Sequence, residues 1–418
     1  MKRREDFKHV IAEWLQQGIP EVKGRETLLP LDSSLVVAVT GARRSGKTCL
    51  LFLTMRRIVE EGRASPDEIL YLDFEHARLK GITAADLDEM LVGFYELTGK
   101  RPKYLFLDEI QGVKDYGGWL RKRLDARVYL SGSSSALTPK RIAGELRGRC
   151  VNYEVHPLSF REYLSFLGHS PPKPEVLLRR EERGKLLSLL RDYLQYGAYP
   201  AVALEGDKKR VLKAYFDSVV VRDLGGTPLA ETLALYLTAN YAQLTTLNKI
   251  YNYLRSLGFQ VGKEKAMELL ERARETYFAF TVEQFRKSER ERKMNPKKLY
   301  IVDTGYPTAL GYEFSVSRAM ENAVYLELLR RGKGEVYYWK EYGKSTGAEV
   351  DFVVSRDFRA EELIQVTYGE EEIREREVRA LEKAKEELEP EKLRILTWDY
   401  RGEIEGMEAV PLWYWLLT

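Results

Sequence analysis

The sequence predicts an α/β protein whose N-terminal part is built on a parallel, three-layer sheet. Two observations carry this prediction. Apolar strand-like runs alternate with helical stretches up to about residue 160, and a glycine-rich loop separates the first of these runs from the helix behind it. Alternation of this kind favours parallel strands, because each crossover helix then covers one face of the sheet. A chain of 418 residues has room for about two or three domains.

The first strand is expected at residues 35–39, directly before the glycine-rich loop. The loop has the form Gly-x-x-x-x-Gly-Lys-Thr and consists of Gly41, Ala42, Arg43, Arg44, Ser45, Gly46, Lys47 and Thr48, followed by Cys49. Between a strand and a helix, such a loop directs backbone N–H groups at phosphate oxygens. A chance glycine turn would not also have both flanking elements. We therefore predict that the loop binds ATP or ADP, with Lys47 on the β- and γ-phosphates and the Thr48 hydroxyl on Mg²⁺.

Further strands are expected at 68–74, 103–109, 128–131 and 151–155, with a helix near 84–97. The strand at 103–109 ends in two carboxylates, Asp108 and Glu109. Two acids that merely end a strand are common, but a phosphate loop upstream favours a hydrolytic role. We predict that Asp108 helps to hold Mg²⁺ through its water shell and that Glu109 activates the attacking water.

Two weaker sets of candidates follow in the same region. Ser131 or Ser133, at the end of the next strand, is expected to hydrogen-bond the γ-phosphate or the water. Arg147 and Arg149 are candidates for an arginine finger, which neutralises charge in the transition state. The alternative for both arginines is a surface or sheet-edge position. A finger that acts in trans would require a homo-oligomer.

The remainder of the chain divides into three parts by pattern. A helical stretch extends to about residue 235. Two short helices at 246–257 and 263–276 and a β pair at 277–285 and 297–302 then give the outline of a winged helix. The last part mixes helices with strands, and its charged helix is expected at 371–388. The predicted domains are an ATPase core at 1–160, a helical connector at 161–235, a winged helix at 236–305 and a C-terminal α/β domain at 306–418.

The winged-helix region carries the strongest local concentration of positive charge. Residues 286–298 contain seven basic and two acidic residues, a net charge of +5. Basic, turn-rich segments of this kind are typical of DNA phosphate contacts. The DNA candidates are Arg290, Arg292, Lys293 and Lys297. A winged helix that packs against protein is the alternative.

Composition excludes some classes of protein. The net charge of the chain is only +3, so any nucleic-acid surface must be local. The sequence contains no apolar run of membrane-spanning length and has a polar N-terminus, and its two cysteines form no disulfide framework. We therefore expect a cytoplasmic protein. Charged residues make up 31% of the chain, against eight Gln and six Asn. A charged helical surface would not deplete the amides, so a hyperthermophile is the favoured source.

Several segments together resemble one family of proteins. They are the phosphate loop with Thr40, and residues 107–111, 131–135, 146–149, 157–164, 196–200, 300–305 and 347–352. The resemblance is to archaeal AAA-type P-loop ATPases whose C-terminal part is an uncharacterised domain with a restriction-endonuclease-like core. It covers nearly the whole chain. It implies an AAA-like ATPase domain, a winged helix and a PD-(D/E)xK-like α/β domain.

The resemblance also indicates where a nuclease site would lie. Such a site needs acids that hold Mg²⁺ and a lysine that orients or activates water. By resemblance, Glu321, Asp351 and Gln365 occupy the metal-binding positions, whereas Thr367 stands where lysine is expected. Lys340 or Lys344 is the candidate substitute. The expectation is therefore a degenerate site that binds but does not cut.

Together these patterns predict a Mg²⁺-dependent ATPase that associates with DNA. Two alternatives stay open. One is a nucleotide-gated regulatory or defence switch with slow turnover. The other is an ATP-dependent nuclease.

Overall fold

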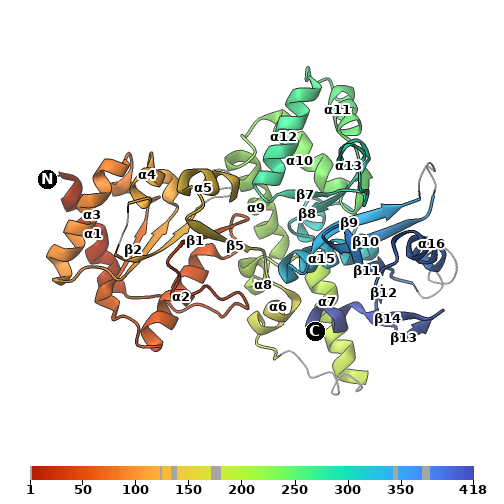
Figure 1. The fold of residues 1–418 in the computed structure, drawn as a ribbon, viewed down its shortest axis with the longest axis horizontal. Helices are drawn as coiled ribbons and strands as arrows, with labels where there is room; N and C mark the ends of the chain where they lie inside the picture. Colours follow the sequence, from red (N-terminus) through yellow and green to blue (C-terminus); the bar gives the residue numbers. More distant parts are fainter. Residues whose placement is uncertain (1, 123–124, 133–138, 171–179, 342–346, 370–376) are drawn as a thin grey trace. The chain divides into compact units, whose positions relative to one another are not determined.

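The computed structural model describes residues 2–122, 125–132, 139–170, 180–341, 347–369 and 377–418. The chain forms two compact units, Met1–Val155 and His156–Thr418, and each is described by itself (Figure 1). Within the described residues, no helix combines the length and the apolar character that crossing a bilayer requires.

The first unit is built on a five-stranded parallel sheet in the order β2-β3-β4-β1-β5. The strands are β1 Val36–Gly41, β2 Ile69–Asp73, β3 Tyr104–Asp108, β4 Arg127–Ser131 and β5 Cys150–Val155. The helices are α1 Lys2–Gln17, α2 Lys47–Glu60, α3 Leu87–Thr98, α4 Tyr116–Leu120 and α5 Pro139–Leu146. Short 3₁₀ turns are η1 Pro66–Glu68, η2 Ala77–Leu79, η3 Ala84–Asp86 and η4 Ile110–Gly112.

Alternate side chains of these strands enter two separate cores, one on each face of the sheet. Val37 and Phe106 pack with apolar residues of α2, such as Leu51. Ala38 and Leu107 pack instead with residues of α1, α3, α4 and α5. Both faces of a parallel sheet must be covered in this way, because its strands are apolar on both sides. The predicted three-layer parallel α/β fold is thus confirmed for this part of the chain.

The second unit begins with helices and continues into two further sheets. Its helices are α6 Phe160–Phe166, α7 Arg180–Tyr196, α8 Pro200–Leu204, α9 Lys208–Arg222, α10 Pro228–Ala239, α11 Leu247–Ser256, α12 Lys263–Glu275, α13 Glu289–Met294, α14 Gly305–Ala309, α15 Val316–Arg331, α16 Val378–Leu388 and α17 Leu412–Leu417. A three-stranded antiparallel sheet of β6 Gln243–Thr245, β7 Ala279–Val282 and β8 Lys297–Ile301 has the order β6-β8-β7.

The six-stranded sheet of this unit is mixed and has the order β13-β14-β12-β11-β10-β9. Its strands are β9 Glu335–Lys340, β10 Glu349–Arg356, β11 Arg359–Val366, β12 Lys392–Thr397, β13 Gly402–Ile404 and β14 Met407–Pro411. The sequence patterns predicted β9, β10 and β11 but not β12, β13 or β14. The described part of the charged helix expected at 371–388 is α16, which buries Leu381 and Ala384.

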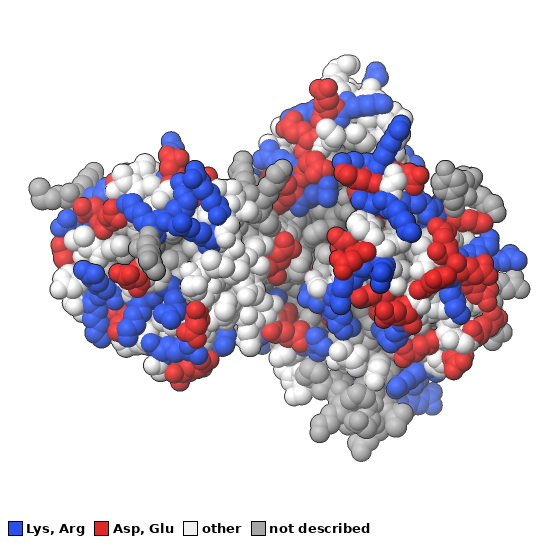
Figure 2. All heavy atoms as spheres, in the orientation of Figure 1, with Lys and Arg blue, Asp and Glu red and all other residues white. Residues whose placement is uncertain are grey.

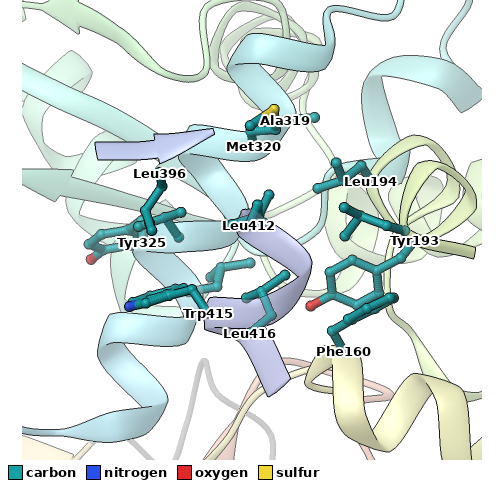
Figure 3. Close-up of a cluster of buried hydrophobic side chains, with 14 of the residues drawn as sticks. Phe160, Tyr193, Leu194, Ala319, Met320, Tyr325, Leu396, Leu412, Trp415 and Leu416 are labelled. Carbon is teal, nitrogen blue, oxygen red and sulfur yellow. The ribbon is translucent and has the colours of Figure 1, made fainter. Parts of the chain in front are cut away.

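One hydrophobic core of the second unit joins several of its elements. Figure 3 shows Phe160 of α6, Tyr193 of α7, Tyr325 of α15 and Trp415 of α17 within the same cluster. Leu396 of β12 joins them from the six-stranded sheet. Residues on both sides of the boundaries expected at 235 and 305 therefore share one core, and the domain divisions within this unit stay predictions.

A buried carboxylate fastens two segments of this unit that lie more than 100 residues apart. Asp303 is 1% exposed, and its two oxygens accept hydrogen bonds from the backbone N–H groups of Ala198 at 2.7 Å and Gly305 at 2.9 Å. Burial raises the pKa of Asp303 to about 7, although these backbone N–H groups act to lower it. Gly197 has a φ of 77°, and a Cβ there would lie only 1.6 Å from an Asp303 oxygen. The Tyr-Gly-Ala-Tyr-Pro segment at 196–200 therefore has a structural role.

Replacing Asp303 by Ala should destabilise the protein, because it leaves two buried N–H groups without an acceptor. Each such group costs about 1–3 kcal/mol, so the midpoint of thermal unfolding, followed by circular dichroism, should fall by several degrees. Asp217→Ala is the control, because Asp217 is 52% exposed and its partner Lys213 is also at the surface. Equal midpoints for the two variants would contradict the role given to Asp303.

Candidate nucleotide site and C-terminal acidic cluster

The glycine-rich loop follows β1 and ends at the first residue of α2. Gly41 has a φ of 136°, and a Cβ there would lie 2.1 Å from the carbonyl oxygen of Val155 on β5. Gly46 caps α2 with a φ of 100°, in the left-handed region that favours glycine. Lys47 is buried, and its Nζ donates to the carbonyl oxygens of Gly41 at 3.2 Å and Ala42 at 3.0 Å. The side chain of Lys47 thus folds back onto the loop residues that precede it.

The residues ahead of β1 also contact this loop. The Nη1 of Arg25 donates to the carbonyl oxygen of Ser45 at 2.7 Å, and the Ser45 hydroxyl donates to the Ala42 carbonyl at 2.8 Å. Arg43 is half-buried, whereas Arg44, with a φ of 66°, and Cys49 are exposed. No sequence pattern pointed to Arg25, because it lies 20 residues before its partner in a segment without regular structure.

The loop and the acidic pair meet at the carboxyl ends of the strands. The hydroxyl of Thr48, at the start of α2, donates to Asp108 Oδ2 at 2.8 Å. Asp108 ends β3, while β4, which separates β3 from β1, ends in Ser131, whose hydroxyl donates to Asp108 Oδ1. Thr48, Asp108 and Ser131 are therefore in one hydrogen-bonded group. Ser133, the alternative to Ser131, lies outside the described residues.

Asp108 is only 2% exposed and is surrounded by neutral donors. The hydroxyl of Tyr71 on β2 donates to Oδ2 at 3.1 Å, and the backbone N–H of Glu109 lies 3.2 Å from Oδ1. Burial raises the pKa of Asp108 to about 6, and the hydrogen bond from Thr48 opposes that shift. Hydroxyl and carboxylate oxygens are the ligands that Mg²⁺ prefers, so Thr48 and Asp108 fit a Mg²⁺ that accompanies bound phosphates.

Glu109 lies just beyond the end of β3 and has a different backbone conformation from the strand. Its φ is 51°, in the left-handed region, and the η4 turn begins immediately after it. Non-glycine residues rarely adopt this conformation, and those that do are often found at functional sites. The side chain is half-buried and accepts a hydrogen bond from the side-chain amide of Gln111. The two adjacent acids thus have different environments, and the division of roles between them stays a prediction.

The two arginine candidates lie at the amino ends of the strands, opposite the carboxyl ends where the phosphate loop lies. Arg149 precedes β5, and its carbonyl oxygen accepts a hydrogen bond at 3.1 Å from the N–H of Val36, the first residue of β1. Its Nη1 donates to the Arg121 carbonyl at 3.0 Å. Arg147, just after α5, is exposed. At about 3.3 Å per residue, the length of β1 separates these amino ends from the phosphate loop.

Not all of the basic side chains in segment 286–298 lie at the surface. Arg286 is 9% exposed and donates to Glu387 of α16 and to the Lys340 carbonyl. Arg292 donates to the Arg286 carbonyl at 2.7 Å, and its side chain is only 14% exposed. Figure 2 shows acidic and basic side chains interspersed on the face that it draws.

Of the other basic residues in this segment, Lys297 is half-buried and lies 2.7 Å from Glu283. Lys298 is buried. Lys287, Arg290 and Lys293 stay exposed. The net charge of +5 counted from the sequence therefore overstates the positive charge at the surface, because some of these basic side chains are paired with acidic residues within the fold.

The residues proposed by resemblance for a nuclease site do come together, but around an unexpected lysine. Glu321 of α15 and Asp351 of β10 both contact Lys298 of β8, and the N–H of Asp351 donates to the Gln365 side chain at 3.2 Å. Lys340, one predicted substitute, lies 3.6 Å from Glu349. The other, Lys344, lies outside the described residues. Thr367 is buried and donates to the Gly369 carbonyl.

The parallel sheet, the glycine-rich loop and the acid-ended strand define a P-loop ATPase domain of the AAA type. The family model described as "AAA domain" matches residues 33–164. Two models for domains of unknown function, DUF8612 and DUF4143, match residues 187–315 and 317–415.

The chain is 31% identical to an uncharacterized protein of Methanocaldococcus jannaschii, over 99% of this chain and 95% of that protein. It belongs to the same family, which joins an AAA-type P-loop ATPase domain to a DUF4143 domain. An uncharacterized protein of Haemophilus influenzae is 28% identical over 92% of this chain and 95% of its own length.

Solved structures give more distant similarities. The Walker-type ATPase of Pyrococcus abyssi is 16% identical with a TM-score of 0.36, over 73% of this chain and 95% of that chain. The Orc1 protein of Aeropyrum pernix in complex with DNA is 14% identical with a TM-score of 0.30, over 74% of this chain and 91% of that chain.

Proposed function

We propose that this protein hydrolyses ATP with Mg²⁺, works as a homo-oligomer and binds DNA. The observation that carries the first part is the contact between Thr48 and Asp108, at 2.8 Å, beside a lysine that closes the phosphate loop. A hydroxyl and a carboxylate side by side next to the loop are the kind of oxygen ligands that a metal ion on the β- and γ-phosphates would need, which supports this part of the proposal.

Each residue then has a distinct task in hydrolysis. The N–H groups of residues 41–48 and the ammonium of Lys47 bind the phosphates, and Lys47 must leave the Gly41 and Ala42 carbonyls to do so. Bound Mg²⁺ supplies charge neutralisation of the phosphates. Glu109 accepts the proton of the attacking water, and the Ser131 hydroxyl keeps Asp108 in place beside Thr48.

Glu109→Gln should retain ATP binding and lose hydrolysis, because the amide cannot accept the proton. A general base contributes roughly 10²- to 10⁴-fold, so steady-state phosphate release should fall by about that factor. Lys47→Ala should instead weaken ATP binding, measured by calorimetry, by roughly 2–5 kcal/mol. Glu60→Gln, on the exposed end of α2, is the control. Hydrolysis by Glu109→Gln at the parent rate would show that another group is the base.

The position of the arginines supports action in trans. Arg147 and Arg149 stand at the amino ends of the strands, whereas the phosphates would bind at the carboxyl ends, so neither side chain reaches the site of its own subunit. If subunits pack head-to-tail, the amino ends of the strands in one subunit face the carboxyl ends of the strands in the next. Such an arrangement would supply the arginine finger and require a homo-oligomer.

Two inactive variants should therefore restore activity when mixed. Glu109→Gln subunits keep the arginines, and Arg147→Ala/Arg149→Ala subunits keep the base, so a mixed interface contains one complete site. Phosphate release should rise above the sum of the two separate preparations, and turnover per subunit should rise with protein concentration. Turnover that stays constant on dilution to a demonstrated monomer would rule out the trans arrangement.

The order of elements in residues 228–301 supports DNA binding. It is helix, strand, two helices and then two antiparallel strands, β7 and β8, with the short helix α13 between them. The first strand pairs with the last, β6 with β8. This order is consistent with the winged helix that we predicted from the sequence. The segment between β7 and β8, which would be the wing, carries the exposed Lys287, Arg290 and Lys293. We assign phosphate contacts to these three residues and not to Arg292 or Lys297, which are paired inside the fold.

Replacing Lys287, Arg290 and Lys293 by Ala should weaken duplex DNA binding for all sequences and flatten its salt dependence. Removing one contact to a DNA phosphate should reduce the slope of log affinity against log salt concentration by about 0.9. The matched control replaces three exposed basic residues of α9, Lys209, Arg210 and Lys213. Fluorescence anisotropy at several salt concentrations measures both. An unchanged slope in the wing variant would show that these three residues do not contact DNA. ATP turnover that does not change when DNA is added would favour the nucleotide-gated switch.

A further inference from the structure

Four charged side chains from three elements meet in the interior of the second unit. The Nζ of Lys298, on β8, lies 2.6 Å from Asp351 Oδ1, 3.1 Å from Glu321 Oε1 and 3.1 Å from Glu349 Oε1. The Lys298 side chain is only 4% exposed. An ammonium group has three N–H donors, and here it faces three carboxylate oxygens.

This ammonium is charged although it is buried. Burial opposes the charge, but carboxylate oxygens of Asp351, Glu321 and Glu349 all lie within 3.1 Å of Nζ and stabilise it. A buried charge is tolerated only when it is paired and hydrogen-bonded. The three carboxylates would repel one another without a cation between them.

The carboxylates are also held by groups other than Lys298. The hydroxyl of Tyr300 donates to Glu321 Oε1 at 2.8 Å, and the N–H of Val366 donates to Asp351 Oδ2 at 2.9 Å. Lys340 Nζ lies 3.6 Å from Glu349 Oε2. The three oxygens that face Lys298 are therefore positioned by the fold around them. Removal of the ammonium would leave these carboxylates close together without a cation between them.

We propose that the ammonium of Lys298 is the permanent cation of this carboxylate site and excludes a divalent metal ion from it. The side chain fills the position in which a metal would contact Glu321, Glu349 and Asp351 together. Within the described ranges, no group of three or more His, Cys, Asp or Glu side chains is arranged to hold a metal ion. The cluster therefore fastens β8 to α15 and β10 and does not catalyse phosphodiester hydrolysis.

Manganese binding to the full chain without nucleotide tests this proposal. The wild-type protein and the Asp351→Asn variant should bind the same amount of Mn²⁺, as measured by electron paramagnetic resonance, because the wild type has no Mn²⁺ site at Asp351. Lys298→Met should lower the midpoint of thermal unfolding by several degrees, since it leaves buried carboxylates without their cation. Mn²⁺ should restore most of that loss, and this variant should bind at least one Mn²⁺ ion that the wild type does not bind. Adding Asp351→Asn to Lys298→Met should abolish the effect of Mn²⁺.

A matched control and a milder variant accompany this experiment. Lys383→Met removes a lysine that lies 3.1 Å from the carboxylate of Glu341, and it should create no Mn²⁺ site. If Lys298→Met does not fold, Lys298→Met/Glu321→Gln removes one excess negative charge and should fold and bind Mn²⁺ through Asp351 and Glu349.

Three results would overturn the proposal. One is Mn²⁺ bound by the wild type through Asp351. Another is a folded Lys298 variant that gains no Mn²⁺ site. The third is cleavage of supercoiled DNA, with Mg²⁺ or Mn²⁺, that disappears in Asp351→Ala and persists in Lys47→Ala.

Discussion

The nucleotide site depends on the hydrogen bond between Thr48 and Asp108, which joins residues 60 positions apart in the chain. Thr48 belongs to the helix that follows β1, and Asp108 ends β3, a strand that does not touch β1. The two can meet only because β4 lies between those strands and all three are parallel. Ser131, at the end of β4, bonds Asp108 from this intermediate position. The order and direction of the strands are thus a requirement of the chemistry.

Features set by contiguous residues could be predicted from the sequence. The phosphate loop is one such feature, since glycines at 41 and 46 satisfy local backbone demands that no other residue meets as well. The acid-ended strand is another, because an apolar run followed by two carboxylates places them at a strand end. The β strands of the first unit followed from the same local alternation, and so did the parallel sheet. Helix and strand ends shifted by a few residues, as end effects commonly do.

Features set by distant contacts could not be predicted in this way. Lys298 lies 53 residues before Asp351, and a basic residue among other basic residues carried no sign that it was buried. Arg286 is similar, because its partner Glu387 is on a helix 101 residues later. Tyr71 gave no signal either, since a tyrosine within a strand usually only packs. Counting charges along a segment treats every side chain as exposed, and it fails where a fold uses charge internally.

Two buried aspartates in this protein illustrate two ways to stabilise a carboxylate away from water. Asp108 receives neutral donors from Thr48, Ser131 and Tyr71, and burial still raises its pKa to about 6. Neutral donors compensate only part of the lost hydration of this carboxylate. Asp351 is bonded instead to an ammonium that belongs to the chain. Its need for a cation is already met, which leaves little to gain from a metal ion. The same residue type is therefore bonded to neutral donors in one unit and to a charged donor in the other, and this difference is what our two proposals for these sites rest on.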